Sequence, residues 1–134
     1  MTPRVDNIRT VPADATIRMG RLAKARQFFQ TAQDVRDLAG EEQDVADSAV
    51  TLYVHAGIAA ADAICAARLG KHAKGQNHQE AIALLKLADR KAANALSVLL
   101  GMKTRAGYGH DPLTAHDLAR AGRAASLLLT HAEL

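Results

Sequence analysis

The chain has 134 residues, of which 49% are hydrophobic, 23% charged and only 3% aromatic, and its formal net charge at pH 7 is +3. The length suits one compact domain, and the apolar share is too high for a disordered chain. Because tryptophan is absent and only two Tyr and two Phe are present, the core must be built from Ala, Leu, Ile and Val. The charge is short of the dense basic patch typical of nucleic-acid-binding domains.

The first half of the chain predicts an arm and two long helices. Residues 1–12 are polar, contain two prolines and lack periodicity, so we expect a loose N-terminal arm. Apolar residues spaced three and four apart then predict one helix over residues 14–38 and a second over residues 42–69, with Gly70 ending the second. The second helix is apolar on two sides, which indicates a central position.

The second half predicts two more helices. After the loop KHAKGQ, a third helix is expected to begin at Asn77, fray past Gly101 and stop before Gly107. The segment AGYGHDP is a predicted loop, and a fourth helix is expected from Thr114 to the C-terminus. No segment alternates with the period of a strand. The predicted fold is therefore all-α, an up-down four-helix bundle over residues 13–134 with antiparallel neighbours.

Two of these helix starts carry capping signals. Asn77 is a good N-cap, and Glu80 follows three residues later, as in a capping box. Thr114 and Asp117 have the same spacing at the start of the fourth helix. We expect each pair to satisfy backbone N–H groups in the first turn.

The cysteine count and the N-terminus bear on location. Cys65 is the single cysteine, so it forms no internal disulfide, and its apolar surroundings predict a small buried side chain. The N-terminus has no apolar core like that of a signal peptide, and no stretch approaches 18 uninterrupted apolar residues. The expectation is a cytoplasmic protein that makes no contact with a membrane.

Six histidines are present, but their spacing does not predict a metal site or a cofactor. No pair has the i, i+4 spacing of a helical zinc site, and no HExxH motif occurs. His55 and Asp62 lie two turns apart on one face of the central helix. A carboxylate among alanines should be paired with an Arg or Lys of another helix if it is buried. These two residues are either a satisfied structural pair or part of a functional site.

The strongest candidate for chemistry is the segment RAGYGH, residues 105–110. A P-loop, a GxSxG elbow and a basic recognition helix are all excluded, and the lack of aromatics argues against a base-stacking platform. A histidine with a near-neutral pKa, here His110, can move a proton from an RNA 2′-hydroxyl, while the guanidinium of Arg105 stabilises charge on the phosphate. The alternative is an ordinary loop, in which Tyr108 packs against the bundle and Arg105 caps the end of the third helix.

An all-helical chain of this size with Arg-x4-His between its last two helices resembles the HEPN superfamily (higher eukaryotes and prokaryotes nucleotide-binding). The resemblance covers roughly residues 14–130 and is carried by SAVTLYVHAGIAAADAICAARLGKHAKGQNHQEAIALL and by LLGMKTRAGYGHDPLTAHDLARAGRAA. It implies a bundle that commonly dimerises, and in many members a metal-independent endoribonuclease of toxin or defence type. Arg105 would then stabilise the phosphate and His110 would be the general acid and base.

Two positions depart from the catalytic members of that superfamily. Ala106 follows the arginine, where toxin members often have Asn or Asp, and Pro112 stands where a related pattern has Tyr. The second hypothesis is therefore a non-catalytic HEPN-like module that binds a nucleotide, a nucleic acid or a protein. A helical scaffold without any ligand is a third hypothesis.

Under the binding hypothesis, the basic residues of the second half attract the ligand. We expect RNA or a nucleotide as partner, a homodimer held by the small residues of the central helix and the edge of the fourth, and a cognate antitoxin. No cofactor is expected. The predicted binding residues are Arg68, Lys71, Lys74, Tyr108, Arg120 and Arg123.

Overall fold

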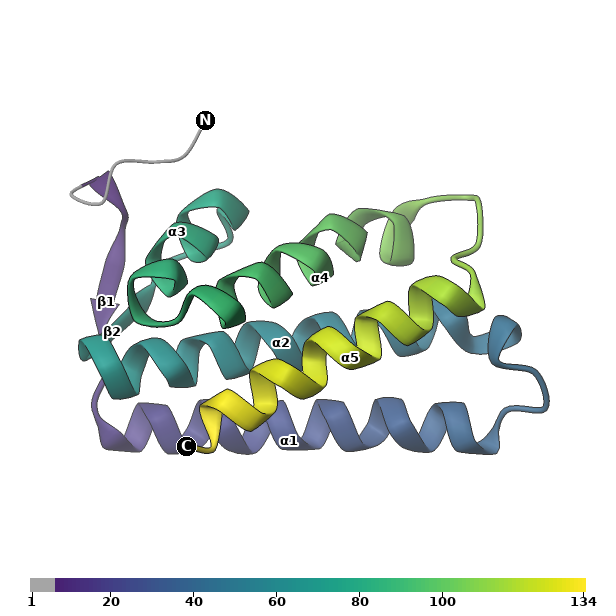
Figure 1. The fold of residues 1–134 in the computed structure, drawn as a ribbon, viewed down its shortest axis with the longest axis horizontal. Helices are drawn as coiled ribbons and strands as arrows, with labels where there is room; N and C mark the ends of the chain where they lie inside the picture. Colours follow the sequence, from purple (N-terminus) through teal and green to yellow (C-terminus); the bar gives the residue numbers. More distant parts are fainter. Residues whose placement is uncertain (1–6) are drawn as a thin grey trace.

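The structure, a computed structural model, describes residues 7–134, and 79% of these residues are helical. Figure 1 shows the long helices lying side by side, with each running opposite to the long helix before it. The elements are β1 (Thr10–Pro12), α1 (Ala15–Leu38), the short 3₁₀ helix η2 (Glu42–Val45), α2 (Ala46–Leu69), β2 (Lys71–Ala73), α3 (His78–Ala88), α4 (Arg90–Tyr108) and α5 (Ala115–Ala132).

The helix ends follow the capping signals of the sequence. The N–H of Ile17 donates to Asp14 at the start of α1 over 2.9 Å. Gly70 ends α2 in the left-handed conformation, with φ of +69°, which only glycine adopts without strain. The first two long helices therefore lie where the sequence predicted them, except that the first turn of the second is 3₁₀.

Helix α2 is the centre of the molecule, as its two apolar faces predicted. It packs against α1, α4 and α5, and Tyr53, Val50 and Ile64 are among its fully buried side chains. Gly57 sets the closest approach, because a Cβ there would lie 2.3 Å from Leu99 Cδ1 on α4. Small side chains on α2 thus let α4 and α5 reach its backbone.

Residues 42–69 are also long and apolar enough, by length and composition, to cross a membrane. In the structure, 72% of the most apolar window of this segment is buried against the other elements. The same test is passed by the core helix of a globular protein.

The structure divides the predicted third helix into two, so the described residues form five α-helices instead of four. Asp89 has an extended backbone, with φ of −163° and ψ of 106°, and its carboxylate accepts the N–H of Ala92 over 3.0 Å to cap α4. An aspartate competes well for this role, so the helix breaks at Asp89. Beyond the break, α4 continues through Gly101 and Gly107 to Tyr108, because its buried face packs on α2 and α5.

Part of the predicted N-terminal arm is docked. Thr10–Pro12 pair antiparallel with Lys71–Ala73, a two-stranded sheet in a chain for which no strand was predicted. Ile8 is buried, and Arg9 holds Glu80 through its backbone N–H (2.9 Å) and its guanidinium (3.1 Å). The Glu80 carboxylate thus binds Arg9, so only one half of the predicted capping box at Asn77 forms. In that half, the Asn77 side chain accepts the Glu80 N–H. Residues 1–6 of the predicted arm lie outside the described residues.

Candidate functional site

Arg105 and His110 lie at the junction where α4 ends and the chain turns toward α5. Arg105 is in the last turn of α4, with 56% of its side chain exposed, and His110 is exposed in the turn that follows. The two residues do not hydrogen-bond to one another, and His110 has no hydrogen bond or ion pair with any residue from 7 to 134. Tyr108 is 85% exposed, so the predicted packing of its ring against the bundle is wrong.

The partner of Arg105 is Asp117, in the first turn of α5. Arg105 Nη2 lies 3.4 Å from Asp117 Oδ2, an oxygen that also accepts the Thr114 N–H and hydroxyl, each over 3.0 Å. The Asp117 N–H donates to Thr114 Oγ1, which completes the predicted capping box. The Thr114 N–H, followed by the Thr114 hydroxyl, Arg105 and Arg120, holds the pKa of Asp117 below its usual range against the effect of burial. Asp117 is therefore an ionised carboxylate that is held in place by Thr114, and it positions Arg105.

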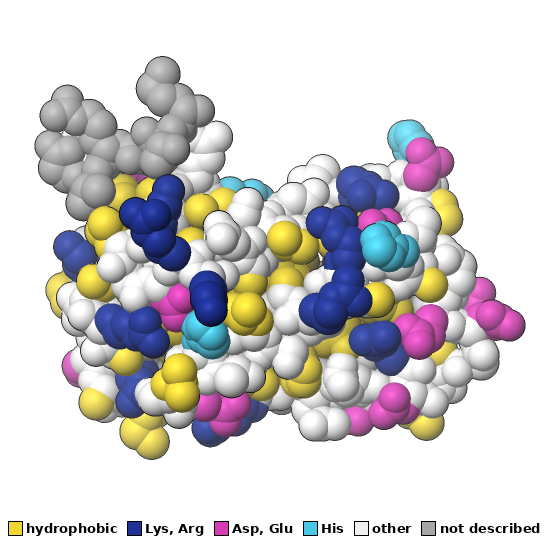
Figure 2. Space-filling view, viewed as in Figure 1, with side chains coloured by type: hydrophobic (Ala, Val, Ile, Leu, Met, Phe, Trp, Pro, Cys, Tyr) yellow, Lys and Arg dark blue, Asp and Glu magenta, His cyan; other side chains and the backbone are white. Residues whose placement is uncertain are grey.

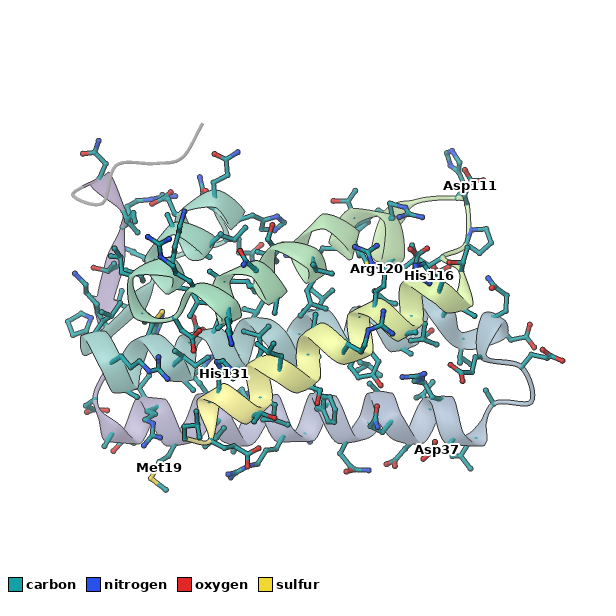
Figure 3. All side chains as sticks on the ribbon, viewed as in Figure 1. Met19, Asp37, Asp111, His116, Arg120 and His131 are labelled. Atoms are coloured by element: carbon teal, nitrogen blue, oxygen red, sulfur yellow. The ribbon has the colours of Figure 1, made fainter. Side chains whose placement is uncertain are left out.

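Two further arginines extend this positive charge along α5. Arg120 Nη1 lies 4.0 Å from Asp117 Oδ1, and Arg123 is exposed one turn later. Figure 3 shows Arg120 and His116 on the first half of α5, in the space between it and the end of α4. Figure 2 shows Lys and Arg side chains gathered over this region. We call Arg105, Arg120 and Arg123 the α4–α5 basic face.

A shallow groove continues this face toward the start of α4. It has a volume of about 430 Å³, and Arg120 and Arg123 line one side while Lys91 and Asn94 line the other. The floor is apolar, formed by residues such as Val98 and Leu127. Lys91 was missed by the sequence reasoning, because the helical pattern placed it in the middle of a longer helix.

The other predicted binding residues lie at the opposite end of the molecule (Figure 1). Arg68, Lys71 and Lys74 are exposed at or after the end of α2, whereas Asp47 at the start of α2 accepts the N–H of Leu113 close to α5. Since α2 has 24 residues and a helix rises about 1.5 Å per residue, the two ends are about 36 Å apart. The predicted binding residues therefore form two groups.

Arg68, at the end of α2, has a structural role. Its Nη1 donates to the carbonyl of Ala88 over 2.8 Å and lies 3.4 Å from Asp89, whose side chain is only 9% exposed. His131 Nδ1 contacts the same carboxylate at 2.5 Å. Backbone and side-chain hydrogen bonds hold the pKa of Asp89 below its usual range, although burial, the largest effect, acts in the opposite direction. The N-cap propensity of Asp89 is a sequence signal that could have indicated this cluster, but its partners, Arg68 and His131, are distant in the sequence.

Asp62 and His55, the two polar residues predicted on one face of α2, have different surroundings. Asp62 is paired with Arg21 of α1 at 3.0 Å, as predicted, and with His72 at 3.9 Å. Burial raises the pKa of Asp62, and Arg21 and then His72 oppose this effect. His55 is exposed and lies against Phe28, with ring centroids 5.4 Å apart.

The comparisons with known proteins and the search for metal ligands add no assignment. The sequence matches no protein-family model, and no curated protein or solved structure matches it. Within residues 7–134, no three His, Cys, Asp or Glu side chains are grouped so that they could hold a metal ion. Cys65 is buried as predicted, and burial followed by the charge of Asp62 raises the pKa of its thiol to about 12, far from a reactive thiolate. The α4–α5 basic face is therefore the candidate functional site.

Proposed function

We propose that the protein is a HEPN-like RNA-binding protein that contacts the phosphate backbone through the α4–α5 basic face. In this proposal α1, α2, α4 and α5 are the four helices of an up-down bundle, and α3 is a short helix inserted before α4. The observation that carries the proposal is the charge balance of this face. The face carries three arginines and one carboxylate, Asp117, which lies near two of them and whose Oδ2 already accepts two hydrogen bonds from Thr114.

The geometry favours contacts with phosphates over contacts with bases. Arg123 makes no ion pair within the described part of the chain, and Arg105 and Arg120 share Asp117 at 3.4 and 4.0 Å. A phosphate can therefore bind these guanidinium groups without removing a strong ion pair. Within residues 7–134, Tyr108 is the one strongly exposed aromatic side chain, and Phe29, which lines a groove with Arg123, is half-buried, so successive bases have no stacking platform.

Fluorescence anisotropy with a labelled single-stranded RNA tests this proposal. We expect the wild-type affinity to fall steeply between about 50 and about 200 mM salt, because phosphate contacts release counterions. Arg120→Gln should weaken binding at every salt concentration, and Lys71→Gln, which removes the same charge at the other end, should not. Equal losses in the two variants, or binding insensitive to salt, would contradict the assignment of this face.

A second candidate function is metal-independent cleavage of the bound RNA, and the position of His110 favours it. His110 is exposed and unengaged in the turn beside Arg105. As a base His110 would take the proton of a 2′-hydroxyl, whose oxygen then attacks the adjacent phosphorus. The bond from phosphorus to the 5′-oxygen breaks, and the 5′-oxygen takes the proton that His110 has gained. The products would be a 2′,3′-cyclic phosphate and a 5′-hydroxyl. Because no hydrogen bond joins the two side chains within one chain, we propose that Arg105 of one copy and His110 of a second copy form the site in a homodimer.

Cleavage in the presence of a chelator, with two histidine variants, tests this candidate. His110→Ala should abolish cleavage without lowering the melting temperature, and His116→Ala, an exposed histidine on α5, should retain it. Full activity in His110→Ala would remove the assignment of His110. Light scattering of the same preparations should give the mass of a dimer, and a monomer at the concentrations of the assay would rule out the shared site. A cognate antitoxin as partner would bind where it covers this junction.

A further inference from the structure

A small pocket lies between α2, α3 and α4, away from the α4–α5 basic face. It holds about 70 Å³ of space, and its inner walls are apolar side chains that include Ile58, Leu96 and Leu100. Since a water molecule needs roughly 10–15 Å³ of such space, the pocket can take a group of about five or six heavy atoms. Its walls favour a hydrocarbon group over water.

Positive charge is concentrated at the rim of this pocket. Lys103 of α4 is partly buried there and forms no ion pair with a carboxylate of residues 7–134. His78, the first residue of α3, also lines the pocket, and burial followed by the charge of Lys103 holds the pKa of His78 below its usual value. The N-terminus of α3 adds the positive end of its helix dipole. Apart from Asp62, the lining therefore carries one full positive charge, that of Lys103, and an imidazole whose pKa is lowered.

The one carboxylate in the lining, Asp62, is engaged elsewhere. Its Oδ2 accepts from Arg21 at 3.0 Å, and its Oδ1 lies 3.9 Å from His72. Asp62 is thus part of a local cluster with α1 and β2, and it leaves the charge of Lys103 unmatched.

A second cavity meets the first at Lys103. It has a volume of about 320 Å³ and shares Gln76 and Lys103 with the inner pocket, while Thr51, His55 and Tyr108 form much of its remaining wall. The Lys103 side chain therefore lies between an apolar pocket and a wider cavity with a larger polar share in its lining. This is the arrangement that a molecule with an apolar body and one negatively charged end requires.

We propose that these joined cavities bind a small organic carboxylate, with its hydrocarbon body between α2 and α4 and its carboxylate on the ammonium group of Lys103. A monoanion matches the single charge at the rim. The ligand would also contact the last turn of α4, where Tyr108 lines the outer cavity and from which Arg105 projects. The site shares no lining residue with the α4–α5 basic face.

Titration of the full chain with pentanoate and with pentanamide, followed by heteronuclear NMR, tests the proposal. The two probes have similar shapes and differ in charge. We expect pentanoate to shift the amide signals of residues that line the pocket, such as Ala61 and Gly75, saturably, and with an affinity at least about tenfold higher than that of pentanamide. Lys103→Met should reduce this preference to near unity, whereas Lys91→Met, which removes a charge from the exposed start of the same helix, should preserve it.

Several outcomes would overturn the proposal. These are the absence of saturable shifts with pentanoate, equal affinities of the two probes for the wild type, and a preference that survives Lys103→Met or is lost equally in Lys91→Met. The NMR spectra of the two variants show directly whether each is folded. RNA binding is measured separately, so failure of either proposal leaves the other standing.

Discussion

The two ends of the molecule carry similar charged residues and use them differently. At the end that contains β1, β2 and the end of α2, arginines and carboxylates are tied across elements: Arg9 to Glu80, Arg21 to Asp62, and Arg68 to Asp89. At the end that contains the α4–α5 junction, Arg36 is tied to Glu42, but Arg105 and Arg120 share one carboxylate, Asp117, and keep 56% and 43% of their side chains exposed. The first set holds elements together, and the second leaves positive charge on the surface. Counting basic residues along the sequence does not separate these two roles.

The largest effect that would test this contrast is expected for Asp89→Ala. The variant removes the N-cap of α4 and leaves Arg68 and His131 without their common partner. We expect the free energy of unfolding, measured by urea denaturation, to fall by about 2–3 kcal/mol. Asp111→Ala, in the exposed turn after α4 (Figure 3), should change it by less than about 0.5 kcal/mol. Similar losses of stability in both variants would contradict the structural role proposed for the charged residues at the end that contains β1 and β2.

A pair of glycine substitutions should act in opposite directions at the two ends. Gly70→Ala forces alanine into a left-handed conformation at the end of α2, so we expect a loss of about 1 kcal/mol of stability. Gly107→Ala, in the last turns of α4 with open space around it, should gain about 0.5–1 kcal/mol from higher helix propensity. Thermal unfolding of both variants checks the prediction, which fails if the two shifts have the same sign.

Sequence reasoning succeeded where the signal was local and failed where the partners were distant. The periodic apolar residues of α1 and α2 and the Thr114–Asp117 capping box have neighbours close in the chain, and their predictions were confirmed. The break at Asp89 depends on Arg68 and His131 as well as on the N-cap propensity of Asp89 itself, and the strand Thr10–Pro12 depends on β2. None of these partners lies within a short sequence window around Asp89 or Thr10–Pro12. The candidate site follows the same rule, because which basic residues are free is decided by tertiary contacts.

Two arginine variants, one at each end of the molecule, should have opposite effects: one lowers stability and the other lowers RNA affinity. Arg68→Gln loses the hydrogen bond to the Ala88 carbonyl and the contact with Asp89, so we expect about 1 kcal/mol lower stability and unchanged RNA affinity. Arg105→Gln loses one exposed ion pair, so stability should change by less than about 0.5 kcal/mol while RNA affinity falls. Denaturation and anisotropy of both proteins decide this. A loss of affinity in Arg68→Gln alone would reverse the roles of the two ends.

The tie between Arg9 and Glu80 predicts a small pH dependence of stability. Hydrogen bonds from the Arg9 backbone and side chain hold the pKa of Glu80 below its usual value in the folded protein. Its contribution is therefore fully present above the pKa of the unfolded chain and is lost as the pH falls through the lower folded value. Glu80→Gln should be less stable than the wild type at neutral pH, and the difference should close in acid. A difference that does not vary with pH would contradict this account of the first end.

The location of bound RNA is the most direct test of the central claim that the α4–α5 end is the binding surface. Hydrogen–deuterium exchange of the full chain, with and without a single-stranded RNA, locates the contact without substitution. The account predicts slower exchange in the turn between α4 and α5 and in the first turn of α5, with residues 68–75 unchanged. Protection confined to residues 68–75, with none around the α4–α5 junction, would contradict it.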